Sequence, residues 1–151
     1  AKYMSTLDLT KGYWQIPLAP EDKEKTAFAT QSGLYHFTVL PFGLHGAPAT
    51  FQRLMDRLLN PFQTFTAAYL DDVVIFSETW DDHLIHLQQI FHTLANAGLT
   101  ANPKKCVIGQ SDISYLGYKI SQGSLQPQTK KVDAILNAPN PTTKKDLRSF
   151  L

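Results

Sequence analysis

The order of apolar and polar residues predicts short strands near the start of the chain. Residues 4–9 alternate between apolar and polar side chains, which is typical of a half-buried strand, and Asp8 lies near its end. Residues 26–30 and 34–40 are rich in aromatic and β-branched side chains, and Gln31-Ser32-Gly33 separates them. Because glycine and small polar residues favour tight turns, these two segments are expected to form a hairpin.

Two later segments carry apolar residues at helical spacing. Residues 48–59 predict a helix that begins at Pro48 and stops at Asn60-Pro61. A second helix is expected to begin at a capping box in residues 79–82 and to end at Gly98. Its predicted apolar face consists of Leu84, Leu87, Phe91 and Leu94.

Between these helices, apolar segments enclose a pair of acids. Residues 65–70 and 73–76 are β-rich and flank Asp71-Asp72, so we expect two strands joined by a two-residue acidic turn.

The final third of the chain predicts further strands and then a connector. Residues 106–108 and 113–120 are expected to be strands, and Gly123 turns the chain back on itself. Residues 126–151 hold three prolines and polar spacers, and we expect a connector in which a helix starts near Lys144. Strands in pairs with interspersed helices predict an α+β domain, an antiparallel sheet with helices packed on one face.

Composition narrows the class of protein. The chain has 151 residues, of which 43% are hydrophobic and 18% charged, which suits one domain and excludes disorder, collagen and a coiled coil. No apolar run exceeds four residues, and no secretory leader is visible, so we expect an intracellular protein without a membrane partner. The single cysteine, Cys106, cannot form an internal disulfide, which fits a reducing compartment.

Charge is distributed unevenly along the chain. Residues 1–98 hold 6 basic and 10 acidic side chains, whereas residues 99–151 hold 8 and 3. One interpretation is a protein that holds cations at one place and a polyanion at another. The alternative is an unevenly charged, solvated surface.

The acidic pair also has two interpretations. A lone Asp71-Asp72 would be a turn more often than a site, because aspartate favours turns. Its apolar flanks favour a site, since two carboxylates held close together repel each other unless a cation is present. Mg²⁺ prefers a few carboxylates, and two-metal phosphoryl transfer uses ions about 3.5–4 Å apart. Asp8, at the end of another strand, would supply a further ligand if the strands are neighbours.

Five blocks of sequence, in the expected order, resemble the motifs of reverse transcriptases. They are Leu7-Asp8-Leu9-Thr10-Lys11-Gly12-Tyr13-Trp14-Gln15-Ile16; Leu40-Pro41-Phe42-Gly43-Leu44 with Ala47-Pro48-Ala49-Thr50-Phe51-Gln52; Tyr69-Leu70-Asp71-Asp72; Pro103-Lys104-Lys105-Cys106; and Tyr115-Leu116-Gly117-Tyr118. The amino-acid sequences of these blocks are most similar to those of gypsy-type LTR retrotransposons, in which the enzyme is part of a Pol polyprotein. The resemblance implies a polymerase right-hand palm with a small β fingers hairpin.

The resemblance implies roles for matching residues. Asp8, Asp71 and Asp72 would bind two Mg²⁺ ions, with Mn²⁺ able to substitute, and Lys105 would donate a proton to the leaving pyrophosphate. The alternative for Lys105 is a surface lysine beside Lys104. Residues implied in binding the incoming deoxynucleotide are Leu9, Thr10, Lys11, Gly12, Tyr13, Phe42 and Gly43. Residues implied in primer or template contacts are Gln52, Tyr69, Leu70, Leu116, Gly117 and Tyr118.

Two of these positions need comment. Tyr13 would discriminate against a 2′-hydroxyl, because its ring fills the space that an extra oxygen needs; the alternative is a core tyrosine beside Trp14. Retroviral enzymes usually carry glutamine where this chain has Phe42, so the contacts of that glutamine are not carried over.

The implied function is RNA-directed DNA polymerisation, a nucleotidyl transfer from dNTPs to a primer on an RNA or DNA template. The resemblance assigns 1–16 to the start of the palm, 17–46 to a partial fingers hairpin, 47–125 to the palm with the paired-Asp and primer-holding hairpins, and 126–151 to a connector toward a thumb. The remaining fingers, thumb and ribonuclease H segments are missing partners, so the chain alone is expected to extend a primer poorly or not at all. Its expected location is the cytoplasm or a virus-like particle.

Two other functions stay open. A catalytically dead or domesticated remnant would act as a nucleic-acid-binding or protein-binding module, and intact acids do not exclude it. An RNA-directed RNA polymerase is less favoured, because those enzymes usually carry glycine where this chain has Leu70, and Tyr13 favours deoxynucleotides.

The remaining polar features have plain interpretations. His83 and His86 are expected on a solvated helix face rather than in a metal pair, because no cysteine or further histidine completes a zinc set. Cys106 is expected to be a small buried hydrophobe. An exposed connector, rather than a phosphate-binding tail, is expected to carry Lys130, Lys131, Lys144, Lys145 and Arg148.

Overall fold

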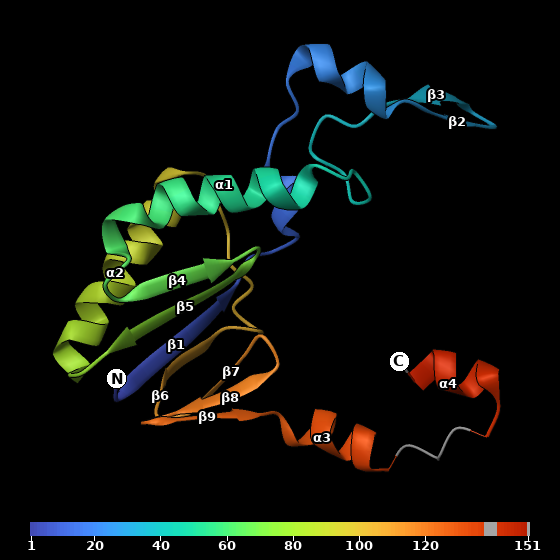
Figure 1. Cartoon of the computed structure of the whole chain (residues 1–151). Coiled ribbons are helices and arrows are strands. Elements are labelled where there is room, and N and C mark those ends of the chain that lie inside the picture. Colours follow the sequence, from blue (N-terminus) through green and yellow to red (C-terminus); the bar gives the residue numbers. More distant parts are fainter. Residues whose placement is uncertain (138–141, 151) are drawn as a thin grey trace.

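A four-stranded antiparallel sheet forms the centre of the protein. The computed structural model describes residues 1–137 and 142–150, and Figure 1 shows this sheet with strand order β4-β5-β1-β6. Its strands are β1 (Tyr3–Asp8), β4 (Thr66–Tyr69), β5 (Asp72–Ser77) and β6 (Val107–Gln110). Because β1 pairs with both β5 and β6, the first strand of the chain is held along both edges.

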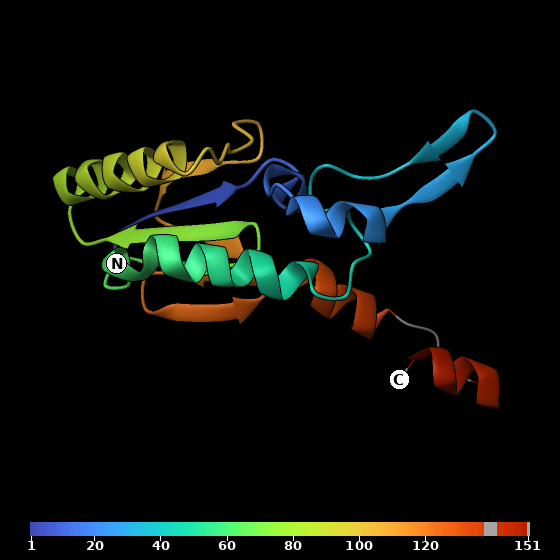
Figure 2. The same ribbon diagram turned by 90° about the horizontal axis from the view of Figure 1, so that it is seen from above.

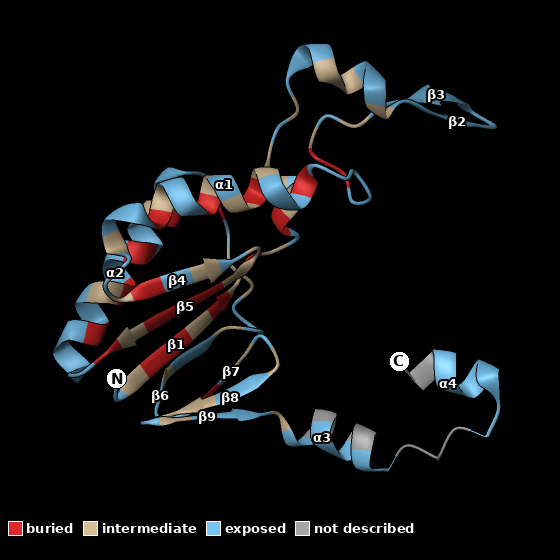
Figure 3. Ribbon diagram, viewed as in Figure 1, coloured by how far each residue is buried: buried red, intermediate tan, exposed pale blue. Residues whose placement is uncertain are grey.

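Two helices, α1 (Ala47–Leu59) and α2 (Trp80–Asn96), cover one face of this sheet. The main core lies between them and the sheet, and Figure 3 shows its buried layer. Its sheet side consists of Leu7, Leu9, Val73 and Ile75, and its helix side includes Phe51, Met55, Leu87, Ile90 and Leu94. The predicted α+β class and both predicted helices are therefore confirmed.

A second, smaller sheet covers the opposite face. It consists of β7 (Ile113–Tyr115), β8 (Tyr118–Ser121) and β9 (Ser124–Pro127), all antiparallel. Met4 and Val74 of the large sheet pack there with Ile113. Each side of the large sheet is thus covered, by helices on one face and by strands on the other.

Residues 17–46 project from one end of the large sheet, as Figures 1 and 2 show. They contain a 3₁₀-helix, Pro20–Thr26, and a hairpin of β2 (Phe28–Thr30) and β3 (Gly33–Tyr35). The predicted hairpin is confirmed, but its second strand is much shorter than the expected 34–40.

The hairpin stops early because the following residues find other partners. The Phe37 N–H donates to the Thr26 hydroxyl (2.9 Å) instead of to a strand carbonyl. The Leu18 N–H then donates to the Thr38 carbonyl (3.0 Å), and the Leu40 N–H to the Ile16 carbonyl (2.8 Å).

The acidic turn also differs from the prediction by one residue. Tyr69 pairs with Asp72, so the two-residue turn is Leu70-Asp71, and Asp72 already belongs to β5. Leu70 has φ +54°, a left-handed conformation that leucine rarely adopts, and the local sequence gives no sign of it. A shift of one residue would turn every side chain of the strand to the other face.

The expected strand 113–120 is two strands. Leu116 (φ +49°) and Gly117 (φ +82°) form a turn in which both central residues have positive φ, as a tight hairpin requires. Residues 126–151 hold more regular structure than expected: β9 ends at Pro127, and α3 (Thr129–Leu136) and α4 (Lys144–Phe150) follow. The helix expected from Lys144 is confirmed up to Phe150, and Leu151 lies outside the described residues.

Helix α2 begins and ends as predicted but presents a different face. The Thr79 hydroxyl accepts from the Asp82 N–H (3.1 Å), and Gly98 follows the helix with φ +72°. Its buried residues are His83, Leu87, Ile90 and Leu94, whereas Leu84 and Phe91 are about half exposed.

The expected solvated face for the histidines is therefore wrong for His83, which is fully buried. It takes a core position because its ring nitrogens lie 2.7 Å from the Ser5 hydroxyl and 2.8 Å from the Ser77 hydroxyl. Cys106 is half-buried against the main core. Within residues 1–137 and 142–150, no helix is both long and apolar enough to span a bilayer.

Candidate active site

Asp8 and Asp72 are direct partners across two neighbouring strands. Asp8 ends β1, Asp72 begins β5, and their Cα atoms are in register. Side chains alternate along a strand, so the two carboxylates share the face opposite to the buried Leu7 and Val73. A hollow of about 170 Å³ lies beside them, lined in part by Lys105, Tyr115 and Leu116.

Asp71 lies in the turn next to this pair. The Leu9 N–H donates to the Asp71 carbonyl (2.9 Å), which ties the turn to the end of β1. A Cβ added to Gly12 would lie 3.2 Å from the Asp71 Cβ and 3.1 Å from the Phe51 ring. The close packing at Gly12 thus fixes the Asp71 backbone against the loop that follows Asp8.

The charged form of Asp72 is disfavoured at this end of the sheet. Burial raises the pKa of the Asp72 carboxyl above its usual range; the charges of Asp71 and Asp8 add to the rise, and Lys105 opposes it. Such oxygen donors fit a hard divalent cation. In the described part of the chain, no three His, Cys, Asp or Glu side chains already form a metal-binding group. Asp8, Asp71 and Asp72 therefore lie at the same end of the sheet, but their side chains do not yet form a complete set of metal ligands.

Lys105 supplies a positive charge at the same place. Its Nζ lies 3.1 Å from Asp8 Oδ2, in an ion pair that joins residues 97 positions apart. The lysine side chain is 63% exposed, whereas the Asp8 side chain is 23% exposed. The lysine is therefore the more solvent-exposed partner of the pair.

Gln52 holds the acidic turn from helix α1. The Leu70 N–H donates to Gln52 Oε1 (2.7 Å), and Gln52 Nε2 donates to the Ala68 carbonyl (3.1 Å) and to Asp56 Oδ1 (2.7 Å). These bonds explain how Leu70 is kept in its unusual conformation. The side chain predicted to contact the template is thus already engaged with the turn.

The residues predicted to bind a nucleotide line the other side of the turn. Tyr13 is half-buried, with ring centroids 5.7 Å from Phe51 and 5.3 Å from Phe42. Phe42 is 60% exposed, and Gly43 has open space around it. The structure therefore presents an exposed aromatic surface beside the acids.

The other nucleotide-binding candidates differ in what they expose. Leu9 and Gly12 are buried, so neither presents a side chain to a ligand. Thr10 is half-buried, and Lys11 lies with its Nζ 4.8 Å from the centre of the Trp14 ring.

The primer and template candidates cluster at two turns. Tyr69 and Leu70 belong to the acidic hairpin, and Leu116, Gly117 and Tyr118 to the β7–β8 turn. Tyr115 joins the two, because its hydroxyl donates to the Asp72 carbonyl (3.4 Å).

Tyr115 was missed as a site residue from sequence. Burial and the charge of Asp72 raise the pKa of Tyr115 to about 12, so its hydroxyl stays protonated as a donor. Its position directly before Leu116-Gly117 is the only signal that the sequence offered.

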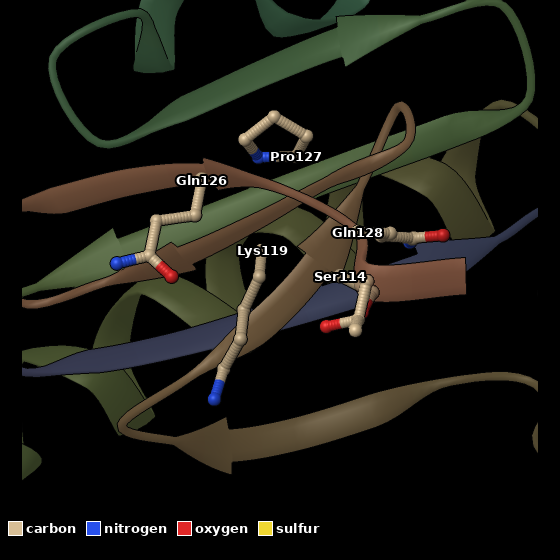
Figure 4. Close-up of a pocket in the computed structure, with 6 residues that line it drawn as sticks. Ser114, Lys119, Gln126, Pro127 and Gln128 are labelled. Atoms are coloured by element: carbon tan, nitrogen blue, oxygen red, sulfur yellow. The ribbon is translucent and has the colours of Figure 1, made fainter. Parts of the chain in front are cut away.

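A wider hollow borders the small sheet and shares Ser114 with the hollow beside Asp8 and Asp72. It measures about 470 Å³ on the outer side of the small sheet, and Figure 4 shows Lys119 among its lining residues. Among the described residues, its lining consists of Ser114, Lys119, Gln126, Pro127, Gln128 and Thr129. It contains none of the residues predicted to act in the site.

Comparisons with known proteins agree on one family. The family model described as "Reverse transcriptase (RNA-dependent DNA polymerase)" matches residues 1–120. The chain is similar to the retrovirus-related Pol polyproteins of transposons 297 and gypsy of Drosophila melanogaster, at 41% and 39% identity over 99% and 100% of its length. It covers 14% and 15% of those polyproteins, a small part of their length.

Solved structures of a foamy viral protease-reverse transcriptase share the fold. One is a complex with double-stranded DNA, with TM-score 0.92 and 32% identity over 99% of this chain and 26% of that chain. Another is a complex with an RNA/DNA hybrid, with TM-score 0.88 and 32% identity over 98% of this chain and 20% of that chain.

Proposed function

The chain belongs to the reverse transcriptase family, of the kind found in gypsy-type transposon Pol polyproteins, and from this premise we propose that it is the catalytic centre of an RNA-directed DNA polymerase. Residues 1–16 and 47–125 form the palm, 17–46 form part of the fingers, and 126–151 lead toward a thumb. Its substrates are dNTPs and a primer on an RNA or DNA template. The register of Asp8 with Asp72 is the observation that carries this proposal.

The acids hold the metal that this chemistry uses. Reverse transcriptases use divalent metal ions, generally Mg²⁺; two ions bound by Asp8, Asp71 and Asp72 would stabilise negative charge on the attacking and leaving oxygens. Strand pairing fixes the first and last of these carboxylates, and Gly12 and Gln52 fix the backbone of the turn that carries Asp71. Such preorganisation suits a reaction that depends on positioning and charge rather than on covalent catalysis.

The surrounding residues bind and orient the substrates. Tyr13, packed beside Phe42, borders the deoxyribose, and its ring fills the space that a 2′-hydroxyl would need. Lys105, released from Asp8, donates its proton to the leaving pyrophosphate. The turn Leu116-Gly117 holds the primer end beside Asp72, to which Tyr115 links it.

Primer extension on an RNA template tests this function. The protein is this chain inserted in place of the matching segment of the transposon 297 polyprotein, with Asp71→Asn and Asp72→Asn variants as controls. Extension that needs Mg²⁺ or Mn²⁺ and disappears in the controls supports a polymerase. No extension by a folded protein that still binds primer-template would favour the binding-remnant alternative.

The isolated chain tests a separate part of the proposal. We expect it to bind primer-template weakly and to extend a primer poorly or not at all, because the remaining fingers and thumb contribute to substrate binding. Robust Mg²⁺-dependent extension by the 151-residue chain would contradict this expectation.

A further inference from the structure

Gln15 makes an unusual set of contacts for a surface glutamine. Its Nε2 donates to the Thr10 carbonyl (2.6 Å) and to the Thr100 carbonyl (3.1 Å). Its Oε1 accepts from the Thr100 N–H (2.7 Å) and the Thr100 hydroxyl (3.1 Å). Both amide hydrogens and both lone pairs are therefore used.

These bonds make Gln15 an extra rung between two segments. The Thr10 N–H donates to the Thr100 carbonyl (2.9 Å), and the Asn102 N–H donates to the Asp8 carbonyl (2.8 Å). Those two backbone bonds are a short ladder around the Leu9–Ala101 bridge. Gln15 closes the open end of this ladder, because its amide pairs with Thr100 as a neighbouring peptide group would.

The ladder leads directly to Lys105. Asn102 begins a turn in which its carbonyl accepts from the N–H groups of Lys105 (3.0 Å) and Cys106 (3.1 Å). Its side-chain Oδ1 accepts from the Lys104 N–H (3.1 Å). The position of Lys105 is therefore set by Asn102, which in turn is set by the ladder at Asp8 and Thr100.

We propose that Gln15 is a positioning residue that holds the backbone of Lys105 beside Asp8. The inference rests on the proposed function, in which Lys105 donates a proton and Asp8 binds metal. Residues 100–106 contain only an isolated bridge at Ala101 and a turn after Asn102. Ala101 and Cys106 pack against the main core, and the two backbone bonds and Gln15 supply the hydrogen bonds that align the segment with Asp8 and Thr10. Loss of the glutamine leaves the fold intact but lets this segment move.

Hydrogen exchange of the 151-residue chain tests whether Gln15 holds this segment, and the measurement needs no catalytic activity. In Gln15→Met, the amides of Thr100, Asn102 and Lys105 should exchange about tenfold faster, while the Ile75 amide in the sheet stays unchanged. Gln63→Met is the matched control, because among the described residues the Gln63 side chain bonds only the nearby Asn60 side chain. Unchanged exchange at all three amides would overturn the proposal, even in a protein that polymerises DNA.

Kinetics of the transposon 297 chimera test the link to Lys105. Gln15→Met should lower kcat about tenfold and change KM for dNTP less than about threefold. In a Lys105→Met background the same substitution should have little further effect, because the group that it positions is gone. Thr100→Val, which removes only the hydroxyl bond, should stay close to the parent.

The two readouts separate the possible failures. Equal losses from Gln15→Met with and without Lys105 would show a general structural role and overturn the proposal. A parent chimera that does not extend primers would count against the proposed function. Hydrogen exchange at the Lys105 amide would then be the remaining test of whether Gln15 positions Lys105.

Discussion

Asp8 and Asp72 face each other across the β1–β5 pair, so the two acids are held at a distance that strand pairing determines. Because burial and the nearby charges of Asp71 and Asp8 disfavour the charged form of Asp72, its carboxylate destabilises the fold in the absence of a cation. A site that binds metal places carboxylates close together in this way. The destabilisation at Asp72 can be measured by replacing that residue.

Replacing Asp72 by asparagine should stabilise the metal-free chain and abolish metal-dependent activity. The folded pKa of Asp72 is raised above its ordinary 3.8, so its contribution to stability is present below that pH and is lost as the pH rises through the folded pKa. At neutral pH the charged group therefore destabilises the fold. Asp72→Asn should raise Tm without metal and weaken Mg²⁺ binding at least about 100-fold, since changes one shell further out already cost 10- to 100-fold.

Thermal unfolding with and without Mg²⁺ measures both effects. Asp112→Asn, a change at an exposed carboxylate directly before β7, serves as the control. A lower Tm for metal-free Asp72→Asn would show that the repulsion is not what limits stability at this position.

The predictability of this site differs from residue to residue. Helices α1 and α2 follow from apolar spacing and capping, because local sequence alone determines those signals. The register of Asp8 with Asp72 needed the structure, since strand order is set by packing between distant segments. The one-residue shift of the acidic turn needed it too, because Leu70 is held by Gln52 from another element.

Buried polar networks were the least visible from sequence. His83 has the spacing of a core residue on α2, but a histidine is counted as polar until its partners are known. Its partners are Ser77, six residues earlier at the end of β5, and Ser5, 78 residues earlier on β1. Gln15 and Tyr115 were hidden for the same reason, as their partners are 85 and 43 residues away.

Replacing Lys105 by methionine removes the charge of the side chain and keeps most of its apolar length, so it tests what the charge contributes. An exposed ion pair contributes up to about 1 kcal/mol, so stability should fall only slightly and Mg²⁺ affinity should rise up to about fivefold once the competing cation is gone. Primer extension should nevertheless fall about 100-fold, because a general acid is lost. Titration calorimetry and single-turnover kinetics measure the two effects, and the neighbouring Lys104→Met is the control. Weaker Mg²⁺ binding in Lys105→Met would contradict the competition.

Replacing Gln52 by methionine should loosen the acidic turn. The Leu70 N–H loses its acceptor at a half-buried position, which should cost about 1–2 kcal/mol of unfolding free energy. Extension should fall about tenfold or more, because Asp71 and Asp72 follow directly in the chain. Urea unfolding and extension assays check this, with Gln88→Met on the exposed face of α2 as the matched control. Equal behaviour of both variants would mean that the turn holds its shape without Gln52.

His83 connects α2 to the centre of the sheet through two serines. The Gly109 N–H donates to the Ser5 hydroxyl (2.9 Å), and the His83 ring lies between that hydroxyl and Ser77. Ser77 also lies 2.8 Å from His86 Nδ1. A neutral ring accepts at one nitrogen and donates at the other, so it satisfies both serines, whereas a protonated ring can only donate.

Protonation of this ring should make stability depend on pH. Burial lowers the pKa of His83 below its ordinary 6.5, and the neighbouring His86 adds to the effect. The folded state therefore binds fewer protons than the unfolded state, so this contribution is complete above about pH 6.5 and is lost as the pH falls toward the folded pKa. The slope of unfolding free energy against pH should reach at most about 1.4 kcal/mol per pH unit for one proton.

Urea unfolding between pH 8 and pH 5 measures this slope. His83→Gln should be less stable at pH 8 but show a flatter profile. The control, His92→Gln on the exposed face of the same helix, should keep the parent slope. A parent slope retained in His83→Gln would assign the pH dependence to another group.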